Sequence, residues 1–363
     1  MTDQERWMKQ ALRLARKGAG WVNPNPMVGA VLVKDGNVIG QGFHRYFGGP
    51  HAEVEALNSV TVPVNDATLY VNLEPCIHQG KTPPCTRLLV EKGIRRVVVA
   101  MPDPNPLMNG KGISWLKSHG VQVETGLLQS EAERLNEIFC KYIRSRKPFC
   151  LYKGAMTLDG KIATVTGESR WISSEVSRNM VHNLRHEFSA VMVGLGTVLK
   201  DDPGLQARRS GRVKKDPLKV IVDSSCRIPQ DSRVLAQNPQ LTVLAVTRKA
   251  PLAKMAVIRR MGAQVIVCPE KHEQVDLHYL MLALGAMDID SVLMEGGGTL
   301  AFSALQDNII DKVLFFIAPK FLGGKKAPTL LEGDGFRRMA EAVPLKSMEI
   351  KKLGEDLIIE GYL

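Results

Sequence analysis

Three residues far apart in the sequence constrain the fold of this chain more than any other feature, because their types suit a single metal ion. Two are Cys76 and Cys85 in the run LEPCIHQGKTPPC, residues 73–85, and the third is His51 in the tripeptide HAE. Six cysteines in 363 residues are too few for a disulfide framework, which leaves these two thiols as candidate ligands. An imidazole and two thiolates form a three-ligand zinc site whose fourth position is left for water. The fold must therefore bring the three side chains together.

The order His-x-Glu, then Pro-Cys, then a second Cys is the signature of zinc-dependent base deaminases. Bound zinc lowers the pKa of water to about 7, so that hydroxide is available at neutral pH. Glu53, two residues after His51, is expected to carry protons without binding the metal. The usual second half of the signature is Pro-Cys-x-x-Cys, whereas eight residues separate the cysteines here. A structural zinc with His78 as the fourth ligand, or three unrelated core residues, would also fit the bare pattern.

Strand and helix patterns alternate through the first half of the chain. Residues 2–17 are predicted to form an amphipathic helix that begins with a capping box of Thr2 and Glu5. The run MVGAVLVKDGNVIGQGFH predicts a hairpin about its Asp-Gly turn. Further patterns predict strands over 67–73, 95–101 and 121–125, and helices that begin at about His51 and at Cys85. A second capping box, Ser130 and Glu133, predicts a helix that runs to about Ile143. The alternation indicates an α/β sandwich of roughly 145 residues.

A basic junction, RSRKPF at residues 144–149, precedes a second α/β series, so we expect two domains, 1–146 and 147–363. In the second, FCLYKGAM, SAVMVG, KVIVD, LTVLAV, QVIV, SVLM and KVLFFIA are predicted strands, and 174–187 is a predicted helix. The run EGGGTLAFSAL, residues 295–305, follows a strand and opens a helix. Backbone N–H groups at such a helix start favour a phosphate group, although a tight strand-to-helix turn fits the pattern equally well.

The net charge of +11 indicates an anionic partner. The Lys and Arg residues are scattered or form short clusters without interleaved aromatic residues, which favours a phosphate-bearing small molecule over nucleic acid. The sequence shows no signal-peptide pattern and no run of about 18 apolar residues. We therefore expect a cytoplasmic protein that binds neither nucleic acid nor a membrane.

The first half resembles the deaminase half of the bifunctional deaminase/reductase family of riboflavin biosynthesis, in the motifs NPNPMVGAVLVKDG, GPHAEVEAL, LEPCIHQGKTPPC and MPDPNPLMNGKG. The resemblance implies a cytidine-deaminase-like α/β/α sandwich with one zinc ion per chain. It implies hydrolytic deamination of 2,5-diamino-6-(5-phosphoribosylamino)pyrimidin-4(3H)-one, in which oxygen replaces the exocyclic 2-amino group. It also implies a substrate pocket that includes Asn23, His44, His78 and Lys81, of which Lys81 suits a phosphate.

The second half resembles the reductase half of the same family, in GAMTLDGKIA, GESRWIS, VGLGTVLKDDPGL, IVDS and LMEGGGTL. The resemblance implies a dihydrofolate-reductase-like α/β domain that uses NADPH to reduce the ribosyl group of the deaminated product to a ribityl chain. The implied NADPH contacts are Ala155, Trp171, Thr197, Asp201, Ser224, Gly297, Gly298, Thr299, Leu300, Ala301, Phe302 and Ser303. The implied substrate contacts are Ser169, Arg185, Leu205, Arg208 and Glu295, of which the two arginines suit the ribose phosphate.

Three polar residues, Lys153, Asp201 and Glu295, are the candidates for a catalytic share in the reduction. The resemblance also implies a homo-oligomer, either a dimer or a tetramer. Two other functions fit parts of the sequence. One is a zinc deaminase of another base whose second domain only helps to bind substrate. The other is a non-enzymatic RNA-binding protein with a four-ligand structural zinc, which would leave Glu53 without a role.

Overall fold

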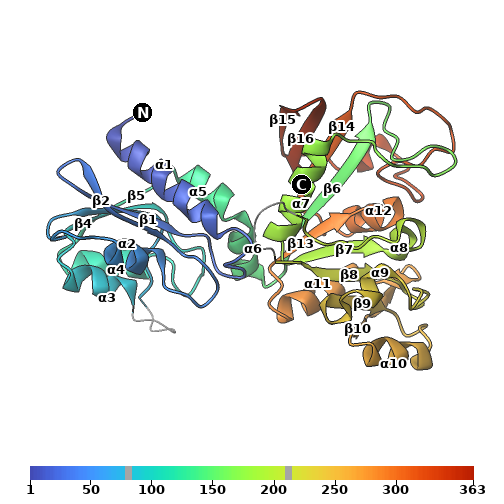
Figure 1. Ribbon diagram of the computed structural model, residues 1–363, viewed down its shortest axis with the longest axis horizontal. Helices are drawn as coiled ribbons and strands as arrows, with labels where there is room; N and C mark the ends of the chain where they lie inside the picture. Colours follow the sequence, from blue (N-terminus) through green and yellow to red (C-terminus); the bar gives the residue numbers. More distant parts are fainter. Residues whose placement is uncertain (78–83, 209–214) are drawn as a thin grey trace. The chain divides into compact units, whose positions relative to one another are not determined.

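The computed structural model describes residues 1–77, 84–208 and 215–363. Its contacts divide the chain into two compact units, Met1–Arg146 and Lys147–Leu363 (Figure 1). The division falls inside the basic junction RSRKPF. Each unit has its own central sheet and its own buried apolar clusters, so each is described by itself.

The first unit is built on a five-stranded sheet with the strand order β2-β1-β3-β4-β5. The predicted hairpin forms, with β1 antiparallel to both β2 and β3, while β3, β4 and β5 are parallel. The parallel strands end at the same edge of the sheet, which is where the metal-ligand candidates lie. The strands are β1 Gly29–Lys34, β2 Asn37–Phe43, β3 Thr68–Leu73, β4 Arg96–Met101 and β5 Gln122–Thr125.

Helices cover both faces of this sheet because successive strand residues point to opposite sides. Val31 and Val33 pack in one apolar cluster with α1 and α5, whereas Ala30 and Leu32 pack in the other with α2, α3 and α4. Figure 1 shows these two helical layers on either side of the sheet. The helices are α1 Asp3–Ala15, α2 Ala52–Asn58, α3 Cys85–Glu91, α4 Lys111–Ser118, α5 Gln129–Leu135 and α6 Glu137–Ser145, and the 3-10 turn η1 Arg16–Gly18 follows α1.

Only one of the two predicted capping boxes forms. At α1, the Thr2 N–H donates to Glu5 Oε2 over 2.8 Å, and the Glu5 N–H donates to Thr2 Oγ1 over 3.2 Å. The box predicted at Ser130 was wrong, because α5 begins at Gln129 after Leu128, which has a left-handed φ of 57°. The helix predicted to run from Ser130 to about Ile143 is instead interrupted at Asn136, which separates α5 from α6.

The interruption at Asn136 coincides with a tertiary contact. Its buried side-chain amide accepts the Met27 N–H at 2.8 Å and donates to the Met27 carbonyl at 3.0 Å. This pair of bonds ties the end of α5 to the segment that precedes β1. Local sequence carries no signal for such a contact, which is why the pattern predicted one continuous helix.

The second unit contains a nine-stranded sheet in the described residues, with the order β10-β9-β8-β7-β13-β6-β14-β16-β15. The strands from β10 to β14 are parallel to one another, and β16 and β15 complete the edge as an antiparallel pair. The seven predicted strands all form, whereas the closing pair was not predicted. The strands are β6 Phe149–Thr157, β7 Ala190–Gly194, β8 Leu218–Val222, β9 Thr242–Val246, β10 Gln264–Val267, β13 Ser291–Glu295, β14 Lys312–Ala318, β15 Ser347–Leu353 and β16 Asp356–Tyr362, with a separate hairpin of β11 Glu270–Lys271 and β12 Gln274–Val275.

The predicted helix over 174–187 is α7, which Ser174 caps from outside its first turn. The side chains of Ser174 and Ser177 both donate to the buried carboxylate of Asp356 on β16, so the final strand helps to fix α7. Within the described residues, no helix is both long and apolar enough to cross a membrane. The helices are α7 Glu175–Glu187, α8 Leu195–Asp201, α9 Arg233–Ala236, α10 Leu252–Arg260, α11 Leu277–Ala286 and α12 Gly298–Gln306, with 3-10 turns η2 Pro239–Leu241 and η3 Met339–Glu341.

Candidate functional sites

The three metal-ligand candidates converge in the first unit. His51 is the N-cap residue of α2, Cys76 follows the end of β3, and Cys85 is the first residue of α3. Their ligand atoms all lie within 4.8 Å of one another. His51 Nδ1 lies 3.3 Å from Cys85 Sγ and 3.5 Å from Cys76 Sγ. Residues from a helix start, a strand end and a second helix start therefore meet at one point.

The separations suit zinc. Tetrahedral zinc with Zn–N and Zn–S bonds of ordinary length holds its nitrogen and sulfur ligands about 3.6 Å apart. The two nitrogen–sulfur distances, 3.3 and 3.5 Å, are close to that value. The donor set of one imidazole and two thiols is also one that zinc prefers. The residues present therefore fit a zinc ion with one coordination position not filled by these three side chains.

The cluster concentrates charge even in the protein alone. A hydrogen bond with Cys76 raises the pKa of His51 to about 9, and hydrogen bonding with Cys85 lowers the pKa of Cys76 to about 4. Cys85 keeps its proton, because its hydrogen bond to Cys76 and its burial raise its pKa. The backbone N–H of Cys85 also donates to Cys76 Sγ over 3.4 Å. A metal ion would replace the protons on His51 and Cys85, so metal binding must release protons.

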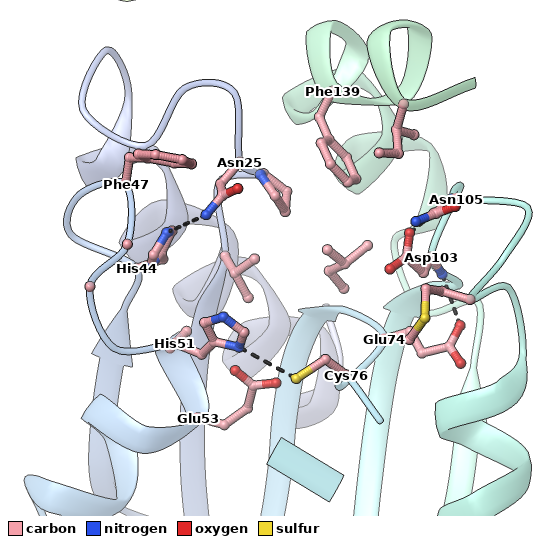
Figure 2. A pocket seen from close by; sticks show the side chains of 18 residues that line it. Asn25, His44, Phe47, His51, Glu53, Glu74, Cys76, Asp103, Asn105 and Phe139 are labelled. Carbon is pink, nitrogen blue, oxygen red and sulfur yellow. Dashed lines mark hydrogen bonds between the residues drawn. The ribbon is translucent and has the colours of Figure 1, made fainter. Parts of the chain in front are cut away.

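The proton-carrier candidate, Glu53, lies in the first turn of α2 and is only 3% exposed. Burial of its carboxyl raises the pKa, and the positive charge at His51 opposes that shift only in part. Figure 2 shows the Glu53 carboxyl beside the His51 ring and Cys76. A carboxyl whose pKa is raised holds a proton more readily than an ordinary glutamate, which suits a general acid–base group.

The cluster opens into a cavity of about 400 Å³. Its size and its mixture of apolar walls with a few polar groups are typical of a small-molecule site. Figure 2 shows His51, Glu53 and Cys76 on its floor, with His44 and Asn25 on one wall and Asp103, Asn105 and Phe139 on the other. The lining residues are Asn25, Pro26, Val28, His44, Phe47, Gly48, Gly49, His51, Ala52, Glu53, Leu73, Glu74, Cys76, Asp103, Asn105, Met108, Phe139 and Ile143.

His44 is one of the predicted pocket residues that line this cavity. Its Nδ1 lies 2.9 Å from the Pro50 carbonyl oxygen. A carbonyl oxygen can only accept a hydrogen bond, so Nδ1 is the donor and carries the hydrogen. Its Nε2 then accepts from the Asn25 side-chain amide at 3.3 Å. Burial lowers the pKa of His44, which favours this neutral ring. The hydrogen bonds therefore fix the tautomer and orient the Asn25 amide.

Of the other three predicted pocket residues, only Asn23 falls within the described part of the chain. Asn23 lies in the turn before β1 and is not among the lining residues, whereas Asn25 of the same NPNP run is. His78 and Lys81 fall at 78–83, outside the described residues. The roles assigned to these three residues stay predictions.

Sequence reasoning missed the wall formed by Asp103, Asn105 and Met108. These residues belong to the run MPDPNPLMNGKG, which supported the family resemblance without any of its residues being assigned a role. Its position directly after a parallel strand was the available signal, because the ends of parallel strands are where ligands bind. Phe139 and Ile143 of α6 gave no such signal, since they read only as apolar helix positions.

In the second unit, a buried ion pair joins two predicted site residues. Arg185 of α7 donates from Nε and Nη2 to the two oxygens of Glu295, at 2.6 and 2.9 Å. Glu295 ends β13, where it is the register partner of Lys153 on β6. Burial alone would raise the pKa of Glu295, but the charge and hydrogen bonds of Arg185 lower it overall. Burial lowers the pKa of Lys153, although the Glu295 charge opposes this shift.

The glycine-rich run forms the predicted strand-to-helix turn. Gly296 and Gly297 have left-handed φ values of 78° and 82°, and α12 begins at Gly298. A Cβ atom at Gly296 would lie 3.3 Å from Thr197 Oγ1, so the turn closely approaches α8. The structure therefore brings Thr197 next to the glycine turn, and the contact of both with a cofactor stays a prediction. Glycine adopts these positive φ values readily because it has no Cβ atom.

The remaining predicted residues of the second unit lie on several elements. Leu205 is buried with a φ of 51°, and the Arg208 N–H donates to His182 Nδ1 over 3.3 Å. Asp201 is the last residue of α8. Ala155 lies on β6, Ser224 follows β8, Ser169 and Trp171 lie between β6 and α7 with Trp171 exposed, and Thr299, Leu300, Ala301, Phe302 and Ser303 belong to α12.

Comparisons with known proteins agree with this two-part architecture. Residues 148–359 match the family described as the RibD C-terminal domain, and residues 1–101 match the cytidine and deoxycytidylate deaminase zinc-binding region. The riboflavin biosynthesis protein RibD of Actinobacillus pleuropneumoniae is 44% identical over 360 residues, which span 99% of this chain and 95% of that protein.

Two solved structures match along nearly the whole chain. Acinetobacter baumannii RibD, form 1, superposes with a TM-score of 0.88 at 35% identity, covering 99% of this chain and 98% of that one. A diaminohydroxyphosphoribosylaminopyrimidine deaminase/5-amino-6-(5-phosphoribosylamino)uracil reductase from Thermotoga maritima gives a TM-score of 0.85 at 36% identity, with the same coverage.

Proposed function

This chain belongs to the RibD family of bifunctional riboflavin-biosynthesis enzymes, which combine a deaminase and a reductase domain, and from that premise we propose which residues perform each reaction. The expected two-domain α/β fold, deaminase first and reductase second, is confirmed. Because the match covers the full chain, neither a deaminase with a mere binding appendage nor a structural-zinc RNA-binding protein describes it.

We propose that the first unit acts on 2,5-diamino-6-(5-phosphoribosylamino)pyrimidin-4(3H)-one. Water replaces the exocyclic 2-amino group, ammonia leaves, and the product is 5-amino-6-(5-phosphoribosylamino)uracil. The name of the Thermotoga maritima relative supports this substrate. The observation that carries the assignment is the convergence of His51, Cys76 and Cys85 beside a cavity that His51, Cys76 and Glu53 line.

His51, Cys76 and Cys85 would hold the zinc ion. Zinc, when bound, lowers the pKa of water to about 7 and so supplies a nucleophile at neutral pH. Glu53 would accept a proton from the water that attacks the ring carbon and would deliver it to the departing amine. Its buried carboxyl has a raised pKa, which suits a group that must release its proton again within each turnover.

The side walls of the cavity would orient the pyrimidine. On one wall, the Asn25 amide is held by the neutral His44 ring. On the other, Asp103 and Asn105 present a carboxylate and an amide, which can pair with the amino groups and ring nitrogens of a diaminopyrimidine. Polar groups on two facing walls can fix a planar ring so that only one of its carbons approaches the metal.

We propose that the second unit uses NADPH to reduce 5-amino-6-(5-phosphoribosylamino)uracil to 5-amino-6-(5-phosphoribitylamino)uracil. The reaction adds a hydride to C1′ of the sugar and a proton to the ring oxygen, and it breaks the bond between those two atoms. The nicotinamide cofactor supplies the hydride when it is bound. The turn at Gly296–Gly297 and the start of α12 form a cradle that side chains would fill, and such backbone suits a cofactor phosphate.

We propose that Lys153 donates the proton in the reduction and that Glu295 provides a fixed negative charge beside it. They are register partners on adjacent strands, and Arg185 keeps the Glu295 carboxyl ionised. Burial lowers the pKa of Lys153 and brings this ammonium closer to the range in which it can donate a proton. Asp201, at the end of α8, is proposed to contact substrate or cofactor rather than the Arg185–Glu295 pair.

A coupled assay beside metal analysis tests the function. Purified protein is supplied with the diaminopyrimidinone ribotide and NADPH, and ammonia and nicotinamide absorbance are followed together. One zinc per chain, ammonia release and NADPH oxidation are expected. Zinc with ammonia but no NADPH oxidation would contradict the role proposed for the second unit, and zinc with neither activity would contradict both. We also propose a homo-oligomer in the cytoplasm, which light scattering and cell fractionation can check.

A further inference from the structure

We propose that Glu74 is a positioning residue for the deamination, because its carboxylate fixes the backbone of the segment 103–113 that carries one wall of the cavity. This inference rests on the function proposed above for the first unit. Glu74 directly precedes Pro75 and the ligand Cys76, so one tripeptide would supply both a metal ligand and the support for the facing wall.

Three backbone N–H groups converge on the Glu74 side chain. Its Oε2 accepts from Asp103 at 2.9 Å and from Gly110 at 3.0 Å, and its Oε1 accepts from Ile113 at 3.1 Å. The residue is 5% exposed, so these bonds are largely shielded from water. Bonds to an ionised acceptor are stronger than neutral ones, and burial makes their loss costly.

The anchor reaches the cavity through a short relay of local bonds. Asp103, whose N–H binds Glu74, uses its own Oδ1 to accept the Asn105 N–H at 2.9 Å. Asn105 Oδ1 in turn accepts the Leu107 N–H at 3.0 Å. Figure 2 shows the bond between Glu74 and the Asp103 backbone, with the Asp103 and Asn105 side chains above it. A shift at Glu74 therefore moves the polar groups of this wall.

Close packing beside Glu74 shows that the junction is built for one geometry. A Cβ atom at Gly112 would lie 2.2 Å from the Pro75 carbonyl oxygen and 3.1 Å from Glu74 Oε1. The segment thus approaches the Glu-Pro-Cys run more closely than any side chain would permit. The backbone N–H of Glu74 also donates to the Met101 carbonyl over 3.1 Å, which ties the same residue to the end of β4.

The substitution Glu74→Gln tests this role with little change in volume. One carboxylate oxygen becomes an NH₂ group, which cannot accept the N–H that it faces. Because the cavity wall moves while the metal and Glu53 do not, KM for the diaminopyrimidinone ribotide should rise about tenfold to a hundredfold, and kcat should fall less. Zinc content and NADPH oxidation on supplied deaminated substrate should stay as in the wild type.

A matched control is Glu124→Gln on β5, which makes the same chemical change elsewhere in the first unit. Glu124 pairs with Arg96 and does not line the cavity. The KM of Glu124→Gln for the diaminopyrimidinone ribotide should therefore stay as in the wild type. An unchanged KM in Glu74→Gln would overturn the inference, whether or not kcat falls. A lower kcat at unchanged KM would only show that a smaller fraction of the protein is folded. If the wild type itself releases no ammonia, the proposed function fails instead.

Discussion

The two candidate sites of this molecule are assembled from the sequence in different ways. In the first unit, the metal-ligand candidates lie at most 34 residues apart and sit at the ends of neighbouring elements. In the second, the buried pair of Arg185 and Glu295 joins residues 110 positions apart. The comparison teaches that a site made of element ends can be read from a motif, whereas a site made of facing strands and a helix depends on the order of strands in the sheet.

The two sites also differ in the direction in which the pKa of their buried glutamate is shifted. Glu53 has a raised pKa because burial dominates and the nearby His51 charge compensates only in part. Glu295 is also buried, but the two hydrogen bonds and the charge of Arg185 reverse the effect and lower its pKa. One carboxyl is thus prepared to hold a proton and the other to remain charged, although both are glutamates in buried surroundings.

The largest separation between the two activities is expected from removing a metal ligand. Cys85→Ser should lose zinc and lower deamination by more than about a hundredfold, because a hydroxyl is a poor substitute for a thiolate on zinc. NADPH oxidation on the deaminated substrate should persist, and chelation of the wild type should give the same pattern. Cys140→Ser changes a buried thiol outside the cluster and should keep both zinc and ammonia release. Loss of both activities in Cys85→Ser would show that the sites are not separable.

The next largest effect is expected from Glu53→Gln, which keeps the shape of the side chain but removes its proton transfer. Ammonia release should fall by about 10²–10⁴-fold while zinc content is retained. Glu55→Gln lies on the same helix, pairs with Arg45 at 2.7 Å outside the cavity, and serves as the control. Persistent ammonia release in Glu53→Gln would mean that another group carries the proton.

The complementary change in the second unit is Glu295→Gln. NADPH oxidation should fall by at least about tenfold, because the amide neither retains the charge beside Lys153 nor accepts both bonds from Arg185. Asp201→Ala should also impair reduction, and both variants should release ammonia at the wild-type rate. An equal loss of ammonia release and NADPH oxidation would argue against independent sites.

The smallest effect is a pH dependence of stability. The folded pKa of Glu295 lies below its ordinary value of 4.5, so its contribution to the free energy of unfolding is complete above that pH and is lost as pH falls through the folded pKa. The stability difference between the wild type and Glu295→Gln should therefore shrink on acidification below pH 4.5. Urea unfolding of both proteins at several pH values measures it. A constant difference would mean that the Arg185 pair does not lower the pKa.

Local sequence predicted most helices and strands, and its errors have physical causes. The assignment of His51, Cys76 and Cys85 as metal ligands stays a prediction. The capping box at Thr2 formed, but the similar pattern at Ser130 did not, because α5 begins one residue earlier, at Gln129. The helix predicted to continue to about Ile143 is interrupted at Asn136, whose side chain binds the Met27 backbone. Arg185 was predicted to contact phosphate, and its guanidinium instead lies against Glu295 in this structure. Its contact with substrate stays a prediction.

The sequence by itself determined what could be coded by residue type and short spacing. The period-2 and helical patterns placed the strands and helices, and the order of His51, Glu53, Cys76 and Cys85 predicted the chemistry of a zinc-dependent deaminase.

Only the tertiary structure decided which backbone groups receive a buried side chain. Glu74 and Asn136 each bind backbone of a segment far away in sequence, at Asp103 and Gly110 in the first case and at Met27 in the second. A hydrogen bond of this kind depends on where two chain segments meet in space. No residue pattern encodes the meeting point, because almost every residue offers the same N–H and carbonyl groups.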